Sequence, residues 1–160
     1  MKDKHNLRGG CPCGDVKYTI NEKPLFTQAC HCKDCKILTG SSFVINTSIF
    51  DSSFDIKGEL SKGELIAGSG KKVTVYFCKK CGVYIYADYE TAVRRLTVRT
   101  KTLENSDMFP PQVHIFTKDK DPWLNLSGDQ NCYEEMYDPN KEWPEERIKR
   151  YKEYLNKIWK

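Results

Sequence analysis

Alternating apolar and polar positions recur in short segments along the first two-thirds of the chain. In residues 15–20, the apolar side chains of Val16, Tyr18 and Ile20 occupy every second position. Such alternation predicts a strand with one buried face. Segments rich in β-branched and aromatic residues follow at 43–50, 54–60, 72–77, 83–88, 94–100 and 112–116. Because no helix-length periodic segment lies between them, the pattern predicts a mainly β core of antiparallel sheets.

The end of the chain, residues 143–159, changes to a helical period. Pro144 suits the first turn of a helix, and two glutamates follow it. The apolar positions at helical spacing are Ile148, Tyr151, Leu155 and Ile158. The pattern predicts an amphipathic α-helix that packs on the sheets. A helix that binds a partner or a membrane surface is the alternative, which the mixed acidic and basic polar face disfavours.

The length of 160 residues fits one domain with a core of its own. We therefore expect a domain at residues 1–140 and a helical extension packed on it at residues 141–160. The net charge of +4 suits an anionic small molecule as well as a nucleic acid. No segment approaches the roughly 20 apolar residues of a membrane span, and "MKDKHNLRGG" lacks the apolar stretch of a signal peptide. These features predict a cytoplasmic protein, whose thiols stay reduced.

Eight cysteines in a reduced chain indicate metal binding rather than disulfides. Cys78 and Cys81 have the C-x-x-C spacing of a zinc knuckle, and Cys11 and Cys13 lie between glycines. Thioredoxin-like redox motifs share the C-x-x-C spacing, but they sit at a helix start, whereas strands flank this one. Two cysteines from each segment would complete a closed, structural zinc site with four thiolates.

Three further cysteines, Cys30, Cys32 and Cys35, lie within one stretch of six residues. One short loop can cover three corners of a tetrahedron but cannot easily reach the fourth, and an open position distinguishes catalytic from structural zinc. Two alternatives stay open. Either Cys132 or His114 completes a second structural site, or Cys30 or Cys32 forms a redox disulfide with Cys35. The redox alternative is disfavoured because no helix start is predicted there to lower a thiol pKa.

Three thiolate ligands also restrict the chemistry of a metal site. They would leave zinc with a net charge of about −1, which makes it a poorer Lewis acid than zinc held by three imidazoles. A thiolate-rich site is soft and favours the binding of a further thiolate. The ligand set therefore favours the handling of a thiol substrate over hydrolysis.

The cysteine segments, taken in order, resemble those of a known family. The stretches "GGCPCG", "CHCKDC" with Gly40 after it, "SGKKVTVYFCKKCG" and "HIFTKDKDPW" are similar to motifs of the glutathione-dependent formaldehyde-activating enzyme family, which shares its domain with centromere protein V. The resemblance covers about residues 8–125, and seven cysteines in this order are much more specific than any one pair. It implies an Mss4-like fold of short antiparallel sheets stapled by zinc.

The resemblance also implies roles for the cysteines and an activity. The structural zinc ligands would be Cys11, Cys13, Cys78 and Cys81, and the catalytic zinc ligands would be Cys30, Cys32 and Cys35. The chain would thus hold two zinc ions and act as a carbon–sulfur lyase. It would join glutathione, or a similar small-molecule thiol, to formaldehyde and give S-hydroxymethylglutathione.

Two segments depart from the family pattern. After the strand "RRLTVR", family members usually show a glycine before an acidic turn, whereas this chain continues with "TKTLENSDMF". We expect that segment to touch a wall of the pocket. The helical tail after residue 140 is not part of the shared domain.

Other residues are weaker candidates for the site. His31 should point away from a metal bound by its neighbours and act as an orienting or surface residue. His114 could face the pocket, although a core or surface histidine is the simpler interpretation. Basic side chains that could bind the carboxylates of glutathione, but are ordinarily solvated, are Lys33, Lys36, Arg94, Arg95 and Arg99. We expect Trp123 and Phe43 in the core and Cys132 as a free thiol.

A non-catalytic binding module is the alternative function. In this hypothesis a zinc-stapled domain recognises nucleic acid or protein, and Lys79 and Lys80 on the C-x-x-C turn favour it. Acidic residues are interspersed with the basic ones, as in "DQNCYEEMYDPNKEW", and no arginine-rich stripe is present. The charge pattern therefore argues against nucleic acid as a partner.

Overall fold

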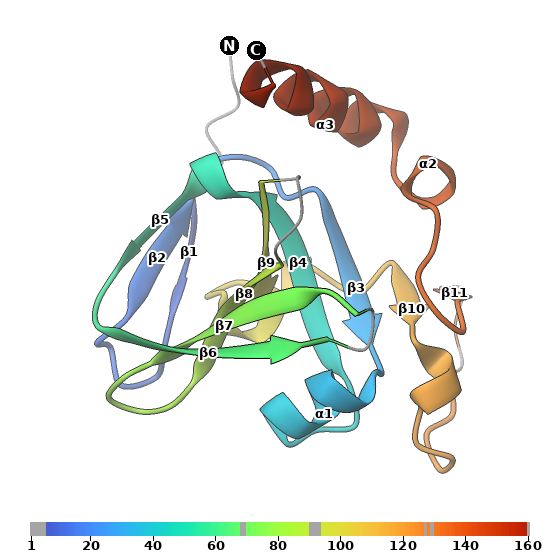
Figure 1. The fold of residues 1–160 in the computed structure, drawn as a ribbon, viewed down its shortest axis with the longest axis horizontal. Coiled ribbons are helices and arrows are strands. Elements are labelled where there is room, and N and C mark those ends of the chain that lie inside the picture. The colour runs from blue at the N-terminus through green and yellow to red at the C-terminus, as the bar shows by residue number, and fades with distance from the viewer. Residues whose placement is uncertain (1–5, 68–69, 90–93, 127, 129, 160) are drawn as a thin grey trace.

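A small β-sheet packs on one face of a large one (Figure 1). The structure, a computed structural model, describes residues 6–67, 70–89, 94–126, 128 and 130–159. Within these residues the small sheet has the order β1–β2–β5 and the large sheet the order β11–β10–β3–β4–β9–β8–β7–β6. Residues 1–5 of the domain expected at 1–140 lie outside the described part of the chain.

The strands of the small sheet are β1 (Leu7–Gly10), β2 (Lys17–Ile20) and β5 (Phe54–Lys57). Those of the large sheet are β3 (Phe26–Cys30), β4 (Val44–Phe50), β6 (Leu60–Ile66), β7 (Lys72–Cys78), β8 (Tyr84–Tyr89), β9 (Arg95–Arg99), β10 (Val113–Ile115) and β11 (Asn131–Cys132). The helices are α1 (Lys33–Thr39), α2 (Pro139–Glu142) and α3 (Glu145–Ile158), with 3₁₀ turns η1 (Asp51–Ser53), η2 (Thr100–Thr102), η3 (Ser106–Met108) and η4 (Thr117–Asp119). The predicted mainly β fold with a C-terminal helix is confirmed.

Most strand pairs are antiparallel, but β10 runs parallel to both β3 and β11. The strand predicted at residues 54–60 is in fact two strands. Gly58 divides them with a φ of 112°, and a side chain there would bring its Cβ to 2.3 Å from the backbone oxygen of Asp15. Because only glycine tolerates this turn, β5 pairs with β2 while β6 moves into the large sheet.

The hydrophobic pattern did not predict two elements next to the cysteines, strand β3 and helix α1. Strand β3 is buried on both faces and so lacks alternation. Helix α1 spans only seven residues, between Cys32 at its N-cap and Gly40 in a left-handed C-cap with φ of 62°. Such a short helix shows no clear period, which explains why the sequence did not predict it.

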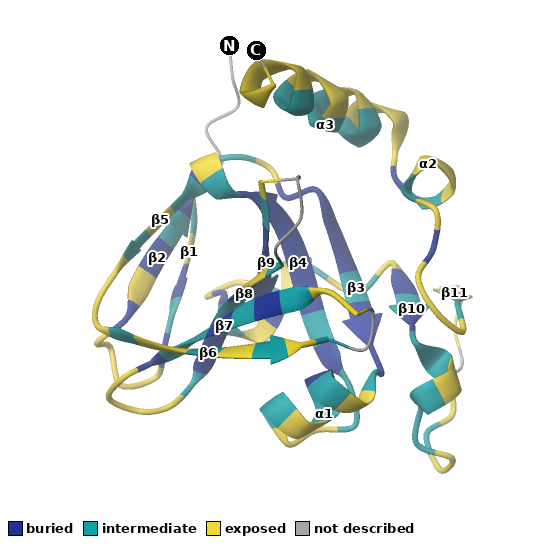
Figure 2. Cartoon of the chain, viewed as in Figure 1, coloured by how far each residue is buried: buried dark blue, intermediate teal, exposed yellow. Residues whose placement is uncertain are grey.

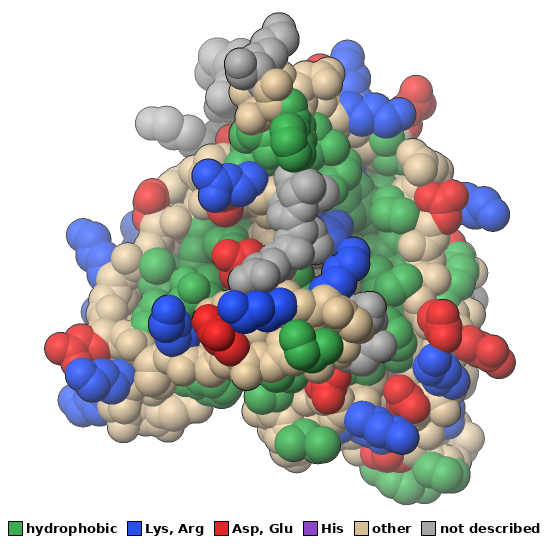
Figure 3. Space-filling view, in the orientation of Figure 1, with side chains coloured by type: hydrophobic (Ala, Val, Ile, Leu, Met, Phe, Trp, Pro, Cys, Tyr) green, Lys and Arg blue, Asp and Glu red, His purple; other side chains and the backbone are tan. Residues whose placement is uncertain are grey.

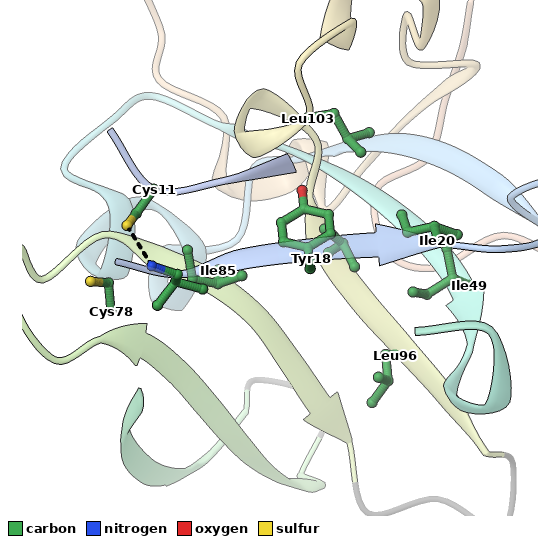
Figure 4. Close-up of a cluster of buried hydrophobic side chains, with 10 residues drawn as sticks. Cys11, Tyr18, Ile20, Ile49, Cys78, Ile85, Leu96 and Leu103 are labelled. Carbon is green, nitrogen blue, oxygen red and sulfur yellow. Dashed lines mark hydrogen bonds between the residues drawn. The ribbon is translucent and has the colours of Figure 1, made fainter. Parts of the chain in front are cut away.

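One hydrophobic cluster fills the space between the two sheets (Figure 4). Its buried members are Cys11, Val16, Tyr18, Ile20, Ile49, Cys78, Ile85, Leu96, Val98 and Leu103. Cys11 and Cys78 lie near each other at one end of it. The thiols of the β1–β2 and β7–β8 turns are therefore anchored to the same core.

A second cluster lies on the opposite face of the large sheet and includes the C-terminal segment. Phe26 and Phe50 pack there with Tyr137 and Trp143, which are 7% and 4% exposed. Helix α3 crosses the end of β3 and β4 that is remote from α1 (Figure 1), and only its inner side is partly buried (Figure 2). The predicted amphipathic helix is thus present and packed on the sheet, although Ile158 at its end is 38% exposed.

None of the helices in the described residues is both long and apolar enough to cross a membrane.

Candidate metal centres

Two turns bring four thiols together at one end of the sheets. Cys11 and Cys13 come from the β1–β2 turn, Cys78 is the last residue of β7, and Cys81 lies in the β7–β8 turn. The four sulfur atoms lie within 4.8 Å of one another, with 3.3 Å from Cys11 to Cys13 and 3.7 Å from Cys13 to Cys78. Metal–sulfur bonds of about 2.3 Å in a tetrahedron place sulfur atoms about 3.8 Å apart. This four-cysteine cluster could therefore hold a metal ion.

The backbone holds the four-cysteine cluster in place. The N–H of Val16 donates to the Cys11 sulfur at 3.2 Å, and the N–H of Gly82 donates to the Cys78 carbonyl at 2.8 Å. Burial raises the pKa of Cys11, but the hydrogen bonds from Val16 and from the neighbouring thiols outweigh it and lower the pKa to about 6. A thiol with such a pKa is readily deprotonated, as a metal ligand must be.

The second group of thiols comes from a single stretch. Cys30 ends β3, Cys32 caps α1, and Cys35 lies in the first turn of that helix. Their sulfur atoms lie within 4.8 Å of one another, and the N–H of Cys35 donates to the Cys32 sulfur at 3.4 Å. Among the described residues no other ligand type joins this three-cysteine cluster, so neither Cys132 nor His114 completes it.

The three thiols share their protons unequally. Hydrogen bonds with the thiols of Cys30 and Cys35 lower the pKa of Cys32 to about 3. The thiols of Cys32 and Cys35, together with burial, raise the pKa of Cys30 well above its usual range. A hydrogen bond from Cys30 lowers the pKa of Cys35. The hydrogen bond with Cys32 and burial have the larger combined effect and raise this pKa to about 11. These opposite shifts arise because three thiolate charges so close together would repel one another strongly.

The start of α1 corrects one step of the sequence argument. The sequence pattern disfavours the redox alternative because it predicts no helix start, yet a helix begins directly after Cys32. All eight cysteines lie in the described residues, and all eight are free thiols. The structure therefore contains no disulfide between Cys35 and either of its neighbours.

A buried cation lies beside the three-cysteine cluster. Arg99 is only 4% exposed, and its positive charge acts to lower the pKa of Cys35. Its guanidinium donates to the side-chain oxygen of Asn46 and, at 3.0 Å, to the hydroxyl of Tyr84, and it stacks 4.2 Å from the centre of the Tyr84 ring. Both acceptors are neutral, so the charge of Arg99 is available to an anionic group in the cluster.

A pocket of about 150 Å³ opens beside Cys30 and Cys32. Strands β3, β4 and β9 line it with side chains at alternate positions, which all lie on one face of the large sheet: Gln28 and Cys30, Asn46 and Ser48, and Arg95 and Thr97. Other lining residues are Cys32, Ala67, Lys71, Tyr89, Ile115, Phe116 and Met136. Polar residues at alternate positions of buried strands, such as Asn46 and Ser48, are the signal in the sequence that could have revealed this pocket.

His31 is fully buried, so the surface interpretation of this residue is wrong. Its Nε2 lies 2.9 Å from Nδ1 of His114, and its backbone N–H donates to Ile115 at 3.0 Å. Burial lowers the pKa of His31 to about 4, which keeps the ring neutral. The residue ties the cysteine loop to β10, which agrees with an orienting role.

The five basic candidates lie in different environments. Arg99 is buried beside the cluster and Arg95 lines the pocket. Arg94 has an exposed side chain that pairs with Asp51 at 3.5 Å. Lys36 pairs with Asp121 at 2.6 Å and thereby links α1 to the "TKDKDPW" segment, whereas Lys33 is exposed.

Three other predictions concern more distant residues. Trp123 is 69% exposed, so the expectation of a core aromatic is wrong there; it follows Pro122 in a turn at the surface. Phe43 is half-buried with its ring centre 5.2 Å from that of His31, and Cys132 is an exposed free thiol. The "TKTLENSDMF" segment does not line the three-cysteine pocket as we expected, because Lys101 and Thr102 border another hollow beside the small sheet.

Comparisons with known proteins agree with this architecture. The family model described as glutathione-dependent formaldehyde-activating enzyme matches residues 6–119. The crystal structure of a Rhodobacter sphaeroides protein, a structural-genomics target, is similar with a TM-score of 0.51 and 21% identity, over 65% of this chain and 96% of that one. At this identity the likeness concerns the fold alone. The search of curated proteins returned no match.

Proposed function

Because the chain belongs to the glutathione-dependent formaldehyde-activating enzyme family, we propose that it is a zinc-dependent carbon–sulfur lyase. Its substrates would be a small-molecule thiol, such as glutathione, and a small aldehyde, such as formaldehyde. Its product would be an S-hydroxymethyl thiol. In this proposal Cys11, Cys13, Cys78 and Cys81 hold a structural zinc ion, and Cys30, Cys32 and Cys35 hold a catalytic one.

One observation carries the proposal: a cluster of three thiols borders a pocket, while a complete cluster of four lies elsewhere. Cys30 and Cys32 both line the pocket, so a ligand in it lies next to a cluster that has no fourth cysteine among the described residues. A closed site excludes ligands, whereas a site with three protein ligands leaves room for one more.

The residues of the pocket suit the addition of a thiol to an aldehyde. A zinc ion in the three-cysteine cluster would keep the sulfur of a bound thiol deprotonated at neutral pH. Residues with hydroxyl groups line the same pocket, namely Ser48, Thr97 and Tyr89. Their O–H groups can donate to the carbonyl oxygen of formaldehyde as the sulfur adds to its carbon. The oxygen then takes up the proton that the thiol released, and the reverse sequence breaks the carbon–sulfur bond.

Arg99 supports the same chemistry through its charge. A zinc centre with three thiolates carries about one negative charge, and a fourth thiolate adds another. In a buried site such charge is costly unless a cation lies near it. Arg99, whose hydrogen-bond acceptors are the neutral Asn46 and Tyr84, supplies that cation. We assign it a positioning and charge-balancing role rather than a catalytic one.

The direct test is the exchange of formaldehyde with glutathione, followed by NMR in the presence of the zinc-loaded protein. We expect faster exchange with the native chain and with Cys132→Ser, whose thiol is exposed and outside both clusters. We expect the acceleration to disappear in Cys32→Ser. If the native chain gave no acceleration with glutathione, other thiols would be tried, and failure with all of them would refute the enzyme proposal.

The structure offers less support for the binding-module alternative than for the enzyme proposal. Lys79 and Lys80 are exposed on the β7–β8 turn, but Lys79 pairs with Glu59 at 2.8 Å. Basic and acidic side chains are mixed over the face shown in Figure 3 rather than segregated. Nucleic-acid binding that weakens steeply with salt would nevertheless favour this alternative.

A further inference from the structure

The chain continues well beyond the part that matches the family. The family match ends at residue 119, and about a third of this chain lies outside the likeness to the Rhodobacter protein, which is itself covered almost completely. We call residues 130–159, which lie beyond both the family match and the "HIFTKDKDPW" motif, the added segment. It is not a loose tail, because Tyr137 and Trp143 are among the buried residues that pack on Phe26.

The added segment reaches the pocket beside the three-cysteine cluster. Met136 lines that pocket directly. Next to it, the hydroxyl of Tyr137 donates to the side-chain oxygen of Gln28 at 2.9 Å, and Gln28 is another lining residue. The indole N–H of Trp143 in turn donates to the Tyr137 oxygen at 3.0 Å. A chain of hydrogen bonds therefore fixes one wall of the pocket to the added segment.

The same segment also supports a cation of the pocket. The guanidinium of Arg95 lies 5.7 Å from the centre of the Trp143 ring, within the range of a cation–π contact. Arg95 and Lys71 are the charged residues that line the described part of the pocket, and none of its lining residues is acidic. The pocket thus favours an anion, and the fork of an arginine matches a carboxylate in particular.

The size of the pocket limits what can enter. Its volume of about 150 Å³ is below the roughly 300–1,000 Å³ of sites that enclose a drug-sized ligand. Met136 is 48% exposed and so lies where the pocket meets the solvent. A compact thiol fits inside, while a longer one must leave part of itself outside, against Met136.

We propose that the added segment makes this site selective for compact thiols that carry a carboxylate, with Arg95 as the receptor for the carboxylate and Met136 as the limit on size. The proposal rests on the proposed function, since it assumes that a thiol binds at the three-cysteine cluster. It assigns the segment outside the family match a role in substrate choice.

The test uses the full chain loaded with Co²⁺, whose absorption changes when a further thiolate binds. Two thiols of similar size serve as probes: 3-mercaptopropionate, which has a carboxylate, and 2-mercaptoethanol, which has none. We expect the carboxylate to strengthen binding by about tenfold, as one charge-assisted hydrogen bond does. The preference should be lost in Arg95→Gln and kept in Arg94→Gln, a neighbouring arginine outside the pocket.

A second pair of variants tests the limit on size. Met136→Ala should bring the affinity of glutathione closer to that of 3-mercaptopropionate, because it removes the side chain at the mouth. Met108→Ala is the control, since Met108 is 72% exposed and does not line the pocket. An unchanged affinity ratio in Met136→Ala would overturn the role of that residue.

The outcomes separate this inference from the proposed function. If both small thiols bind equally to the native chain, or if Arg94→Gln loses the preference as much as Arg95→Gln, the carboxylate receptor is wrong while thiol binding at the cluster stands. If no thiol changes the cobalt absorption, both proposals fall. Thiol binding and its selectivity are thus read from one set of titrations.

Discussion

The two cysteine clusters use the same ligand atom but draw it from the chain in different ways. The four-cysteine cluster joins turns that are far apart in sequence, as the 65 positions between Cys13 and Cys78 show. The three-cysteine cluster comes from six consecutive residues. A metal ion that ties distant segments removes much of the freedom of the unfolded chain, whereas one bound by a local loop removes little. The difference teaches that the first cluster can stabilise the fold while the second is free to serve chemistry.

The surroundings of the two clusters also suit one to stability and the other to chemistry. At the four-cysteine cluster Cys13 and Cys81 are exposed, and the core packs against Cys11 and Cys78. At the three-cysteine cluster two thiols are buried, a pocket opens beside them, and Arg99 is buried close by. Burial, a pocket and an uncompensated cation are features of a site that binds an anion.

The largest effect should separate the clusters by stability. We expect Cys81→Ser to lose several kcal/mol of folding free energy or to fail to fold, because a structural zinc site contributes its binding energy to folding. Cys32→Ser should fold normally and bind one zinc ion fewer. Urea unfolding and zinc content measure both variants. Global unfolding of Cys32→Ser would contradict the division of roles.

A second effect tests whether the added segment belongs to the fold around the three-cysteine cluster. Trp143→Ala should destabilise the chain by about 3–5 kcal/mol, since it empties a buried aromatic site. Trp123→Ala should change stability little, because Trp123 is 69% exposed. Chemical unfolding of the two variants gives the comparison. Equal stability of both would show that the segment does not pack as described.

Substitutions of two glycines, one near each cysteine cluster, test the clusters separately. In Gly58→Ala the new Cβ would lie 2.3 Å from the backbone oxygen of Asp15, within the turn that carries Cys11 and Cys13. Gly40→Ala, at the end of α1, meets no atom within 4 Å. Both residues have positive φ, so we expect a loss of about 1–2 kcal/mol for Gly40→Ala and more for Gly58→Ala. In Gly58→Ala, metal affinity should fall mainly at the four-cysteine cluster. An equal loss of affinity at that cluster in Gly40→Ala would contradict this prediction.

The smallest effect concerns charge at the three-cysteine cluster. Arg99→Met should weaken zinc binding there by about tenfold, or about 1.4 kcal/mol, because it removes the cation beside a negatively charged centre. Arg99→Lys should keep most of the affinity, and the four-cysteine cluster should be unaffected in both. Competition with a chromophoric chelator measures the two sites. If Arg99→Met left the zinc affinity of the three-cysteine cluster unchanged, the charge-balancing role of Arg99 would be wrong.

The sequence predicted those parts of the fold that have a clear period. The segment 72–77 is the core of β7, and 143–159 contains α3, because in each element one face is more buried than the other. Spacing alone grouped the cysteines as the structure does. Their roles as ligands stay a prediction, as does the division at residue 140.

The missed features depend on contacts between distant segments. Strand β3 lies inside the large sheet, between β4 and β10. Side chains on both of its faces are covered, so it shows no alternation. The buried state of Arg99 follows from its pairing with Asn46 in the neighbouring strand, and the place of Met136 follows from the packing of Tyr137 and Trp143. No local pattern contains this information, which arises only when the sheet is assembled.

The most direct test of the division of roles is the stepwise removal of zinc from the loaded native chain by a chromophoric chelator, with circular dichroism recorded in the same cuvette. We predict that one equivalent leaves first without any change in the β signal, and that glutathione slows its release. The second equivalent should leave only as the β signal is lost. Loss of the fold with the first equivalent, or release of both together, would contradict the assignment of one cluster to the fold and the other to chemistry.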